Sequence, residues 1–411
     1  MSRDALVAYD PQMDGGNSPE QRRSNTTLRA AVTTALIFAV AFNLRPAMTA
    51  VGSVLPQLGA DLQLSEGVQG TLGAVPLVAL ALISPLVHHP ARRFGVERAL
   101  MAALIGIVLG VLLRSYGGGL GLWAGTAVLG CAVAVGNVLV PTVLKRDYAG
   151  KVARATGIYS ACMTIGAAIA SVIAVPMSEV VGWRGALAFW AIPAALVALL
   201  WLPRTRAAAR PVEEPEPVSG RPVSVWRQPT AWLVTAFMGL QSTHFFVVAT
   251  WLPTIGLAIG RTPQESGVLL FVFQLAALVG VFTAPRLVRG TNVLPAALAA
   301  SIPMLIGLVG LIALPQLALG WVLIAGAGSG ASLVAGLTLI SLRGRDQQET
   351  TQLSGMAQSI GYLLAAVGPI GAGFMAEWTG GWTASLGMLT AMATVQLIVA
   401  FAVGKDRRVR T

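Results

Sequence analysis

Charge is what this sequence has least of. Of its 411 residues, 11% are charged and 55% are hydrophobic, whereas an ordinary soluble domain carries about 25% charged residues. So little polar surface excludes a soluble globular enzyme and a disordered chain, since both need more. The formal net charge of +11 would indicate nucleic-acid binding only if the basic residues gathered on one face. The remaining class is a polytopic membrane protein.

Cysteine is equally scarce. Cys131 and Cys162 lie inside long apolar runs, a placement that excludes a disulfide framework or a metal site and favours small buried hydrophobes. The polar N-terminus lacks a short apolar core followed by a small-residue cleavage site, so no signal peptide is expected. Residues 1–28 instead read as a disordered cytoplasmic tail. Neither a metal nor a cofactor is expected.

Long apolar runs, by contrast, are abundant. A helix that crosses a bilayer needs about 20 mostly apolar residues, and twelve windows meet this requirement. They cover roughly residues 30–53, 68–88, 98–116, 120–143, 154–177, 184–203, 231–254, 266–285, 292–313, 317–341, 352–376 and 383–404. We therefore expect an all-α membrane protein of twelve transmembrane helices. Its six-helix halves would cover 29–203 and 229–404, with a Pro-, Arg- and Glu-rich cytoplasmic linker at 204–228 and a short tail at 405–411.

The positions of the basic residues predict the orientation. Lys and Arg of membrane proteins collect on the cytoplasmic side. With both termini cytoplasmic, 24 of the 28 basic residues fall in inner loops, the linker or the tails, and the exceptions are Arg45, Arg114, Arg184 and Arg261. We therefore expect a multi-pass protein of the cell membrane that acts as a monomer in the lipid bilayer, with no nucleic-acid partner.

The two halves repeat each other at a shift of about 198 residues. Pro85 and Pro285 close the second and eighth spans. The segments Met177-Ser178-Glu179 and Met375-Ala376-Glu377 follow the fifth and eleventh spans. Both copies cross in the same direction, so the repeat is parallel and its axis lies along the membrane normal. Secondary transporters with this arrangement bind substrate near the midplane, between the halves.

Several local motifs resemble one family of such transporters. They are residues 42–46 (FNLRP) with 49–52 (TAVG), 113–115 (LRS), 136–141 (GNVLVP), 156–160 (TGIYS), 239–242 (GLQS), 251–253 (WLP), 354–362 (SGMAQSIGY) and 368–369 (GP). Through these the chain resembles the major facilitator superfamily over essentially its whole length, and more narrowly its cyanate and nitroimidazole (CynX/NimT-like) branch. The resemblance implies a transporter, not an enzyme. The gating loop between the second and third spans keeps Arg92, Arg93 and Gly95 but lacks the Gly and Asp that usually open this motif.

Arg45 stands out among the charges. None of the 17 acidic residues falls near the middle of a span, which argues against carboxylate-driven antiport. Arg45 lies about 15 residues into the first span, where a central arginine costs about 2.5–3.5 kcal/mol on insertion scales. A buried cation without an acidic partner needs an anion, water or carbonyls. We predict that its planar fork binds the anionic group of the substrate. The alternative is a structural arginine that is bonded to helix carbonyls beside Pro46 and extends outward.

Further polar groups lie at similar depth. Arg114 ends the third span, where its position favours extension toward the membrane surface, although the resemblance makes it a second substrate-binding candidate. His244 lies close to the depth of Arg45 and could carry a coupling proton or stay neutral and hydrogen-bonded beside the cavity. The remaining substrate-binding candidates are Asn137, Tyr159, Gln241, Trp251, Gln274, Gln358 and Tyr362.

The expected function is secondary active transport of a small anionic, nitro- or cyanate-like solute by alternating access between the halves. A proton is one candidate coupling partner, and the sequence leaves the coupling ion and the direction of transport open. The alternative is efflux of hydrophobic compounds by the same fold. A membrane sensor would need an ordered soluble domain or a long signalling tail, and an enzyme would need a nucleophile–base pair or a metal cluster. The sequence shows none of these four features, so neither a sensor nor an enzyme is expected.

Overall fold

A computed structural model describes residues 35–148, 152–207, 225–344 and 347–404, which are helices and short connections without a strand. The predicted tails at 1–28 and 405–411 lie outside the described residues, as does most of the predicted linker. At the edges of that linker, α8 continues to Ala207 and a short 3-10 turn begins at Val225. Three basic residues of the predicted linker, Arg204, Arg206 and Arg227, therefore lie at the ends of helices.

The first half begins with an interrupted apolar segment, Ala35–Leu62. Residues 35–43 are helical and residues 44–45 form a turn. A new helix then starts at Pro46, whose fixed φ suits a first helical position. The elements that follow are α2 (Pro46–Leu62), α3 (Glu66–Ile83), η1 (Ser84–Leu86), α4 (His88–Phe94), α5 (Val96–Tyr116), α6 (Gly118–Asp147), α7 (Val152–Ala188) and α8 (Ala191–Ala207).

The second half repeats this plan. Its elements are η2 (Val225–Arg227), α9 (Pro229–Ala258), α10 (Pro263–Leu287), α11 (Leu294–Ala313), η3 (Pro315–Leu317), α12 (Ala318–Arg343), α13 (Gln347–Thr379) and α14 (Thr383–Gly404). The sequence sets some boundaries sharply. Thr262 and Glu265 form a capping box at the start of α10, with Pro263 at its first position.

Eleven apolar helical segments of the described chain are long enough to cross a membrane, and one of them is double. Arg154–Arg206 has 53 residues, about 80 Å of helix at 1.5 Å per residue. It bends at Gly182, where φ is 72°. Its end returns to its starting side, because Arg204 pairs at 2.9 Å with Asp147, which lies just before α7. The segment therefore crosses twice, which confirms the twelve predicted spans.

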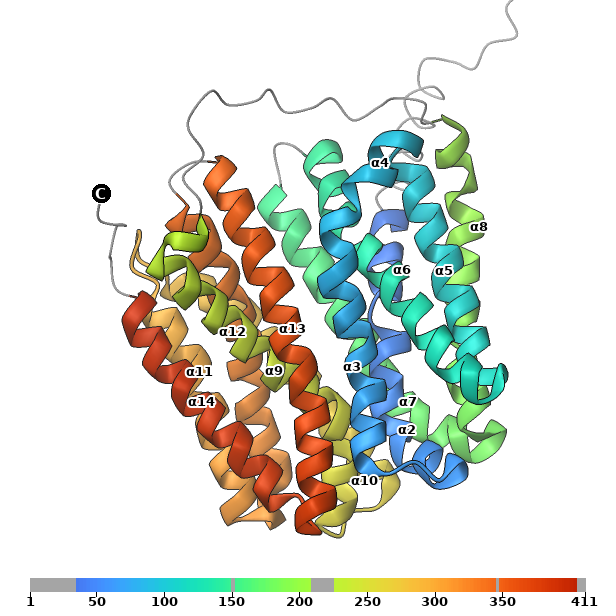
Figure 1. Ribbon diagram of the computed structural model, residues 1–411, viewed down its shortest axis with the longest axis vertical. Helices are drawn as coiled ribbons and strands as arrows, with labels where there is room; N and C mark the ends of the chain where they lie inside the picture. The colour runs from blue at the N-terminus through green and yellow to red at the C-terminus, as the bar shows by residue number, and fades with distance from the viewer. Residues whose placement is uncertain (1–34, 149–151, 208–224, 345–346, 405–411) are drawn as a thin grey trace, which may run out of the picture.

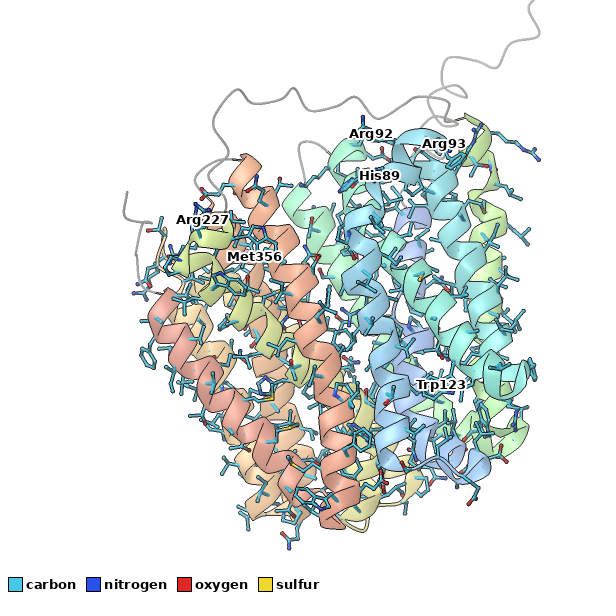
Figure 2. All side chains as sticks on the ribbon, viewed as in Figure 1. His89, Arg92, Arg93, Trp123, Arg227 and Met356 are labelled. Carbon is cyan, nitrogen blue, oxygen red and sulfur yellow. The ribbon has the colours of Figure 1, made fainter. Side chains whose placement is uncertain are left out.

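The two ends of the bundle differ in charge. The end that we call the basic end carries Arg92 and Arg93 on α4 and Arg227 before α9 (Figure 2). The opposite end, the acidic end, carries the loops between α2 and α3, between α9 and α10, and between α13 and α14, with Asp61, Glu265 and Glu377 (Figure 1). The positive-inside rule predicts that the basic end faces the cytoplasm.

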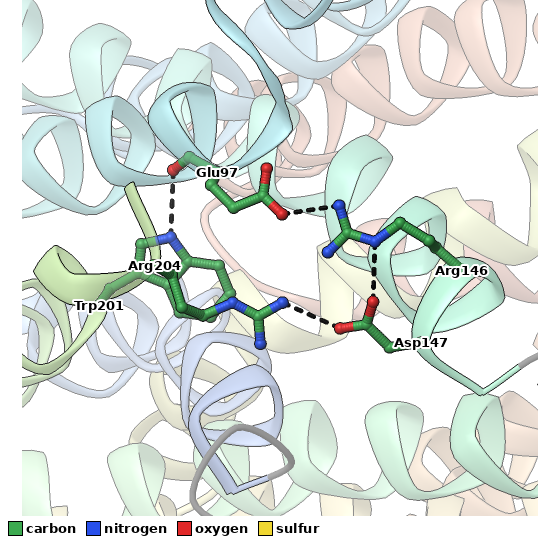
Figure 3. A network of polar contacts seen from close by, with 5 residues as sticks. All are labelled: Glu97, Arg146, Asp147, Trp201 and Arg204. Carbon is green, nitrogen blue, oxygen red and sulfur yellow. Dashed lines mark hydrogen bonds and ion pairs between the residues drawn. The ribbon is translucent and has the colours of Figure 1, made fainter. Parts of the chain in front are cut away.

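A charged network joins α5, α6 and α8 at the basic end (Figure 3). Arg146 contacts Glu97 at 2.7 Å and Asp147 at 2.8 Å, and Arg204 contacts Asp147 at 2.9 Å. The Trp201 indole donates to the Glu97 carbonyl at 3.1 Å. Glu97 is 4% exposed, so the ion pair offsets the burial of its charge. The network ties three helices of the first half into one unit.

The halves meet closely toward the acidic end. Gly52 of α2 lies against α9, where an added Cβ would stand 2.1 Å from the Ala249 carbonyl oxygen. Gly70 of α3 lies against α13 in the same way, 2.3 Å from the Pro369 carbonyl oxygen. The Gly67 amide donates to the Glu377 carboxylate across this seam at 3.0 Å. Glycine is required at positions 52 and 70, because any side chain there would overlap the backbone of the facing helix.

Gly52→Ala is predicted to open the seam, because a backbone oxygen cannot rotate away from the added methyl group. Overpacking of this kind costs about 1–3 kcal/mol. The measurement is the labelling rate of a Thr250→Cys probe by a membrane-impermeant maleimide applied at the acidic end, after Cys131 and Cys162 are changed to serine. The rate should rise at least about fivefold.

Gly387→Ala is the matched control, because no atom lies within 4 Å of the methyl group that it adds to α14. It should label like the parent. Equal labelling of Gly52→Ala and the parent would contradict the assigned seam.

Candidate binding cavity

A cavity lies between the halves, with walls from α2, α3, α5, α6 and α9. It encloses about 560 Å³ of empty space, part of it open to solvent. Its polar lining consists of Arg45, Thr49, Arg114, Thr126 and Thr250, and Phe245 and Phe246 form its aromatic wall. None of the described lining residues is acidic.

Arg45 reaches this cavity from the helix break. Its backbone (φ −110°, ψ −38°) precedes Pro46, which has no N–H to continue the preceding helix. The break therefore marks the position from which the guanidinium projects. Thr49 and Gly52 follow at i+4 and i+7, so they share the face of Arg45 along the cavity.

The guanidinium of Arg45 has aromatic neighbours but no hydrogen bond or ion pair within the part of the chain that the structure describes. Its Cζ lies 4.9 Å from the ring centre of Phe245 and 5.8 Å from that of Phe246. Tyr159 and Tyr362 are near enough to interact with it electrostatically. The alternative in which helix carbonyls hold the guanidinium is therefore not the arrangement seen. Its five donors stay open to a ligand.

Arg114 lines the same cavity, and the expectation that it extends toward the membrane surface is wrong. It is 2% exposed, and its Nη1 donates to the Ala47 carbonyl at 2.8 Å. Its Nε and Nη2 have no partner among the described residues. The reason is the rotation of α5: Arg114 shares a face with the buried residues Ile107, Gly110 and Val111, which point into the bundle.

The opposite wall comes from one face of α9. Phe246, Ala249 and Thr250 follow at i, i+3 and i+4 and line the cavity together. Phe245 and Phe246 pack edge to face, with ring centres 5.0 Å apart. The Thr250 hydroxyl makes no hydrogen bond within the described chain, so it remains free to contact a ligand.

Sequence reasoning missed Phe246 and the three threonines of the cavity. Thr49 and Thr126 donate to carbonyls of their own helices, those of Arg45 and Leu122, as helical threonines often do. A threonine in an apolar span is therefore uninformative by itself. The i, i+3, i+4 spacing that starts at Phe246 was the signal that could have found Thr250.

Three of the predicted polar groups lie near Arg45 without forming the main lining. Tyr159 donates to the Asn137 side chain at 3.4 Å, and Tyr362 packs against Phe246 with ring centres 6.4 Å apart. Both phenols lie in the electrostatic range of Arg45. The structure thus brings together Arg45, Arg114, Tyr159, Tyr362 and, through Tyr159, Asn137.

His244 is not brought to the cavity. It is fully buried, and its Nε2 lies 3.1 Å from the Leu389 carbonyl oxygen of α14. One residue of helix rotates a side chain by about 100°. Because Phe245 faces Arg45, the neighbouring His244 faces away, into the packing of the second half.

Four other candidates do not line the cavity either. The Gln241 amide donates to the Ser242 hydroxyl at 2.7 Å, and the Gln358 amide donates to the Ser354 hydroxyl at 2.8 Å. The Trp251 indole donates to the Pro369 carbonyl at 2.9 Å, which ties α9 to α13. Gln274 is 1% exposed and is not part of the cavity lining.

The predicted gating loop forms α4 at the basic end, apart from the cavity. Arg93 lies over the Phe94 ring at 5.3 Å, and Gly95 joins α4 to α5 with a φ of 86°. That positive φ is the reason for glycine here. Across the described residues, no group of three His, Cys, Asp or Glu side chains is placed to hold a metal ion.

Comparisons with known proteins agree with this architecture. Residues 35–369 match the family model of the Major Facilitator Superfamily. An uncharacterized transporter, YycB, of Bacillus subtilis is 39% identical over 91% of this chain and 93% of its own length. The 2-nitroimidazole transporter of Escherichia coli is 37% identical over 91% of this chain and 95% of its own, and the cyanate transport protein CynX of the same organism is 28% identical over 84% and 89%.

Solved structures share the fold. A bacterial homologue of the lysosomal transporter Spinster, in an inward-facing and unoccupied conformation, aligns with a TM-score of 0.73 and 15% identity over 95% of this chain and 98% of its own. A D-xylose–proton symporter aligns with a TM-score of 0.73 and 16% identity over 93% and 99%.

The twelve-helix, two-half bundle with a central cavity defines a multi-pass membrane transporter. The chain belongs to the major facilitator superfamily, and within it to the branch of the cyanate and nitroimidazole transporters. The relatives are transporters of small solutes and not enzymes, which confirms the family and the class predicted from the sequence motifs.

The position of His244 gives a testable prediction. His244→Gln keeps an N–H that can reach the Leu389 carbonyl, so ligand affinity should stay within about twofold of the parent. His244→Ala leaves a cavity and an unpaired carbonyl, so it should lower the melting temperature without changing ligand affinity. Thermal unfolding and titration calorimetry of both variants test this. Loss of ligand binding in His244→Gln at unchanged stability would place the imidazole in the site.

Proposed function

We propose that the chain transports a small anionic, nitro- or cyanate-like solute across the cell membrane by alternating access, with Arg45 as the group that binds the solute. One observation carries the proposal. The Arg45 guanidinium lies in a cavity between the halves, and no acidic side chain of the described lining neutralises it. An intramembrane charge of this kind is by default a hypothesis of a functional site.

Inside the cavity, the Arg45 guanidinium needs partners in place of part of the water that surrounds it in solution. The two phenylalanine rings stabilise it by about 0.5–2 kcal/mol each through cation–π contacts. They accept no hydrogen bond from its N–H donors in the plane of the guanidinium. A planar anion with two oxygen atoms matches the guanidinium fork and accepts two parallel hydrogen bonds. The cavity therefore favours a compact solute that bears such a group.

The relatives point to the same size of solute. The names of two relatives specify 2-nitroimidazole and cyanate, which are compact molecules with polar oxygen or nitrogen atoms. A flat ring would fit against Phe245, and its polar end would then meet Arg45. We do not include His244, Gln241, Gln274, Gln358 or Trp251 in the proposed site, because none of them lines the cavity.

Alternating access follows from the division of the cavity. The first half supplies Arg45 and the second half supplies Phe245, Phe246 and Thr250, so a bound solute touches both halves. Contacts that differ between two conformations shift their populations. The close contacts of Gly52 and Gly70 correspond to a state closed at the acidic end. With the basic end cytoplasmic, this state would receive or release solute inside the cell.

Efflux of hydrophobic compounds is the second function that the fold allows. The cavity wall is largely apolar, but such compounds give no reason for an unneutralised arginine inside it. The two functions make opposite predictions for Arg45, which the following experiment exploits.

Arg45→Ala is predicted to abolish transport of small planar anions, because it removes the binding fork. Arg45→Lys should reduce transport at least about tenfold, since an ammonium group cannot make the bidentate contact. Uptake into proteoliposomes of radiolabelled nitrate and benzoate is the measurement, with protein insertion checked by detergent extraction.

Arg184→Ala is the matched control, because Arg184 is an exposed arginine paired with Asp61 at the acidic end. It should transport like the parent. Parental transport by both Arg45 variants would remove Arg45 from the site, and transport of hydrophobic cations by Arg45→Ala would favour the efflux function.

A further inference from the structure

A second arginine of the cavity is held differently from the first. Arg114 is 2% exposed, and its Nη1 donates a hydrogen bond to the Ala47 carbonyl oxygen at 2.8 Å. Its Nε and Nη2 atoms are buried without a partner in the described parts of the chain. A buried charged donor that lacks an acceptor is unfavourable, and native structures rarely retain one without a reason.

The contact with Ala47 fixes Arg114 relative to Arg45. Ala47 follows Arg45 by two residues, in the first turn of α2. Glycines bring the helix of Arg114 close to its neighbour: an added Cβ at Gly125 of α6 would stand 2.3 Å from the Arg114 backbone nitrogen. The two arginines line one cavity, and the bond of Arg114 to Ala47 joins them through the start of α2.

We propose that Arg114 is a second substrate-binding residue and that it sets the charge preference of the site, selecting anions over neutral solutes of the same shape. This inference rests on the proposed function of the cavity. Two cations with no acidic residue in the described lining give a positive potential that an anion neutralises. A neutral solute of the same shape offers these donors fewer and weaker acceptors than an anion does.

The opposite half adds shape rather than charge. Phe245 and Phe246 offer aromatic surfaces, and the free Thr250 hydroxyl offers one uncharged donor. A planar monoanion can place its oxygen atoms between the guanidinium groups of Arg45 and Arg114 and its apolar body against Phe245. Affinity for the ring then depends on α9, and affinity for the charge depends on α2 and α5.

The test compares two probes that share a planar frame and differ in charge, benzoate and benzamide. Titration calorimetry of the purified full chain gives both dissociation constants. The parent should bind benzoate at least about tenfold more tightly than benzamide. Arg114→Gln should reduce this preference at least about tenfold, since hydrogen bonds to charged groups have that order of strength. Its affinity for benzamide should stay within about twofold of the parent.

Two further variants keep the test decisive. Arg114→Lys preserves the positive charge and a donor for Ala47 but loses the fork, so it should show an intermediate preference even if Arg114→Gln does not fold. Arg343→Gln is the control, because Arg343 is also buried, donates to the Val403 carbonyl at 2.8 Å, and does not line the cavity. It should lower thermal stability and leave the benzoate preference unchanged.

Several results would overturn the inference. They are equal binding of the two probes by the parent, failure of the parent to bind benzoate, and a parental preference in a folded Arg114→Gln or Arg114→Lys variant. The proposed function fails separately, through parental transport in the Arg45 variants. An unchanged preference in Arg114→Gln together with lost transport in Arg45→Ala would therefore retain Arg45 as the binding group and reject the role of Arg114.

Discussion

A guanidinium that has left bulk water without meeting a carboxylate is the constraint around which this bundle is organised. Arg45 can occupy its position because the chain breaks its first helix at residues 44–45 and restarts it at Pro46. The rings of Phe245 and Phe246 cover the cation from the other half, and they do so without neutralising it. A charge that is stabilised but not satisfied is suited to bind and release an anion repeatedly.

The rest of the structure keeps this site between two separate bodies. Within the first half, the network of Glu97, Arg146, Asp147 and Arg204 ties α5, α6 and α8 at the basic end (Figure 3). Within the second half, Trp251 ties α9 to α13. Between the halves, the contacts rest on glycines that allow helix backbones to touch. Polar bonds hold each half together, and the contacts between the halves are mostly packing contacts. This division allows the halves to rock against each other as rigid bodies.

The fold was largely predictable from the sequence, because crossing a bilayer demands long apolar helices and basic loops in a set order. The end of the first span was not: α2 continues to Leu62, well past the predicted residue 53. Pro56 lies inside α2 and does not end it. Short α4 was also missed, because seven residues rich in His and Arg carry no membrane signal.

The site was predictable only in part. Arg45 could be found because a charge in an apolar span is costly wherever it points. Arg114, His244 and Thr250 depend on helix rotation, which one sequence does not reveal. A difference of one residue directs Phe245 toward Arg45 and His244 toward α14. Helix rotation also turns Arg114 from the membrane surface into the cavity.

A structure of the protein with 4-bromobenzoate bound tests the central claim most directly, because anomalous scattering locates the bromine atom independently of the map. The account predicts one site, with the carboxylate within hydrogen-bonding distance of Arg45 and the bromine atom on the side of Phe245. Bromine density outside the cavity, or a ligand inside it whose carboxylate points away from Arg45, would contradict the account.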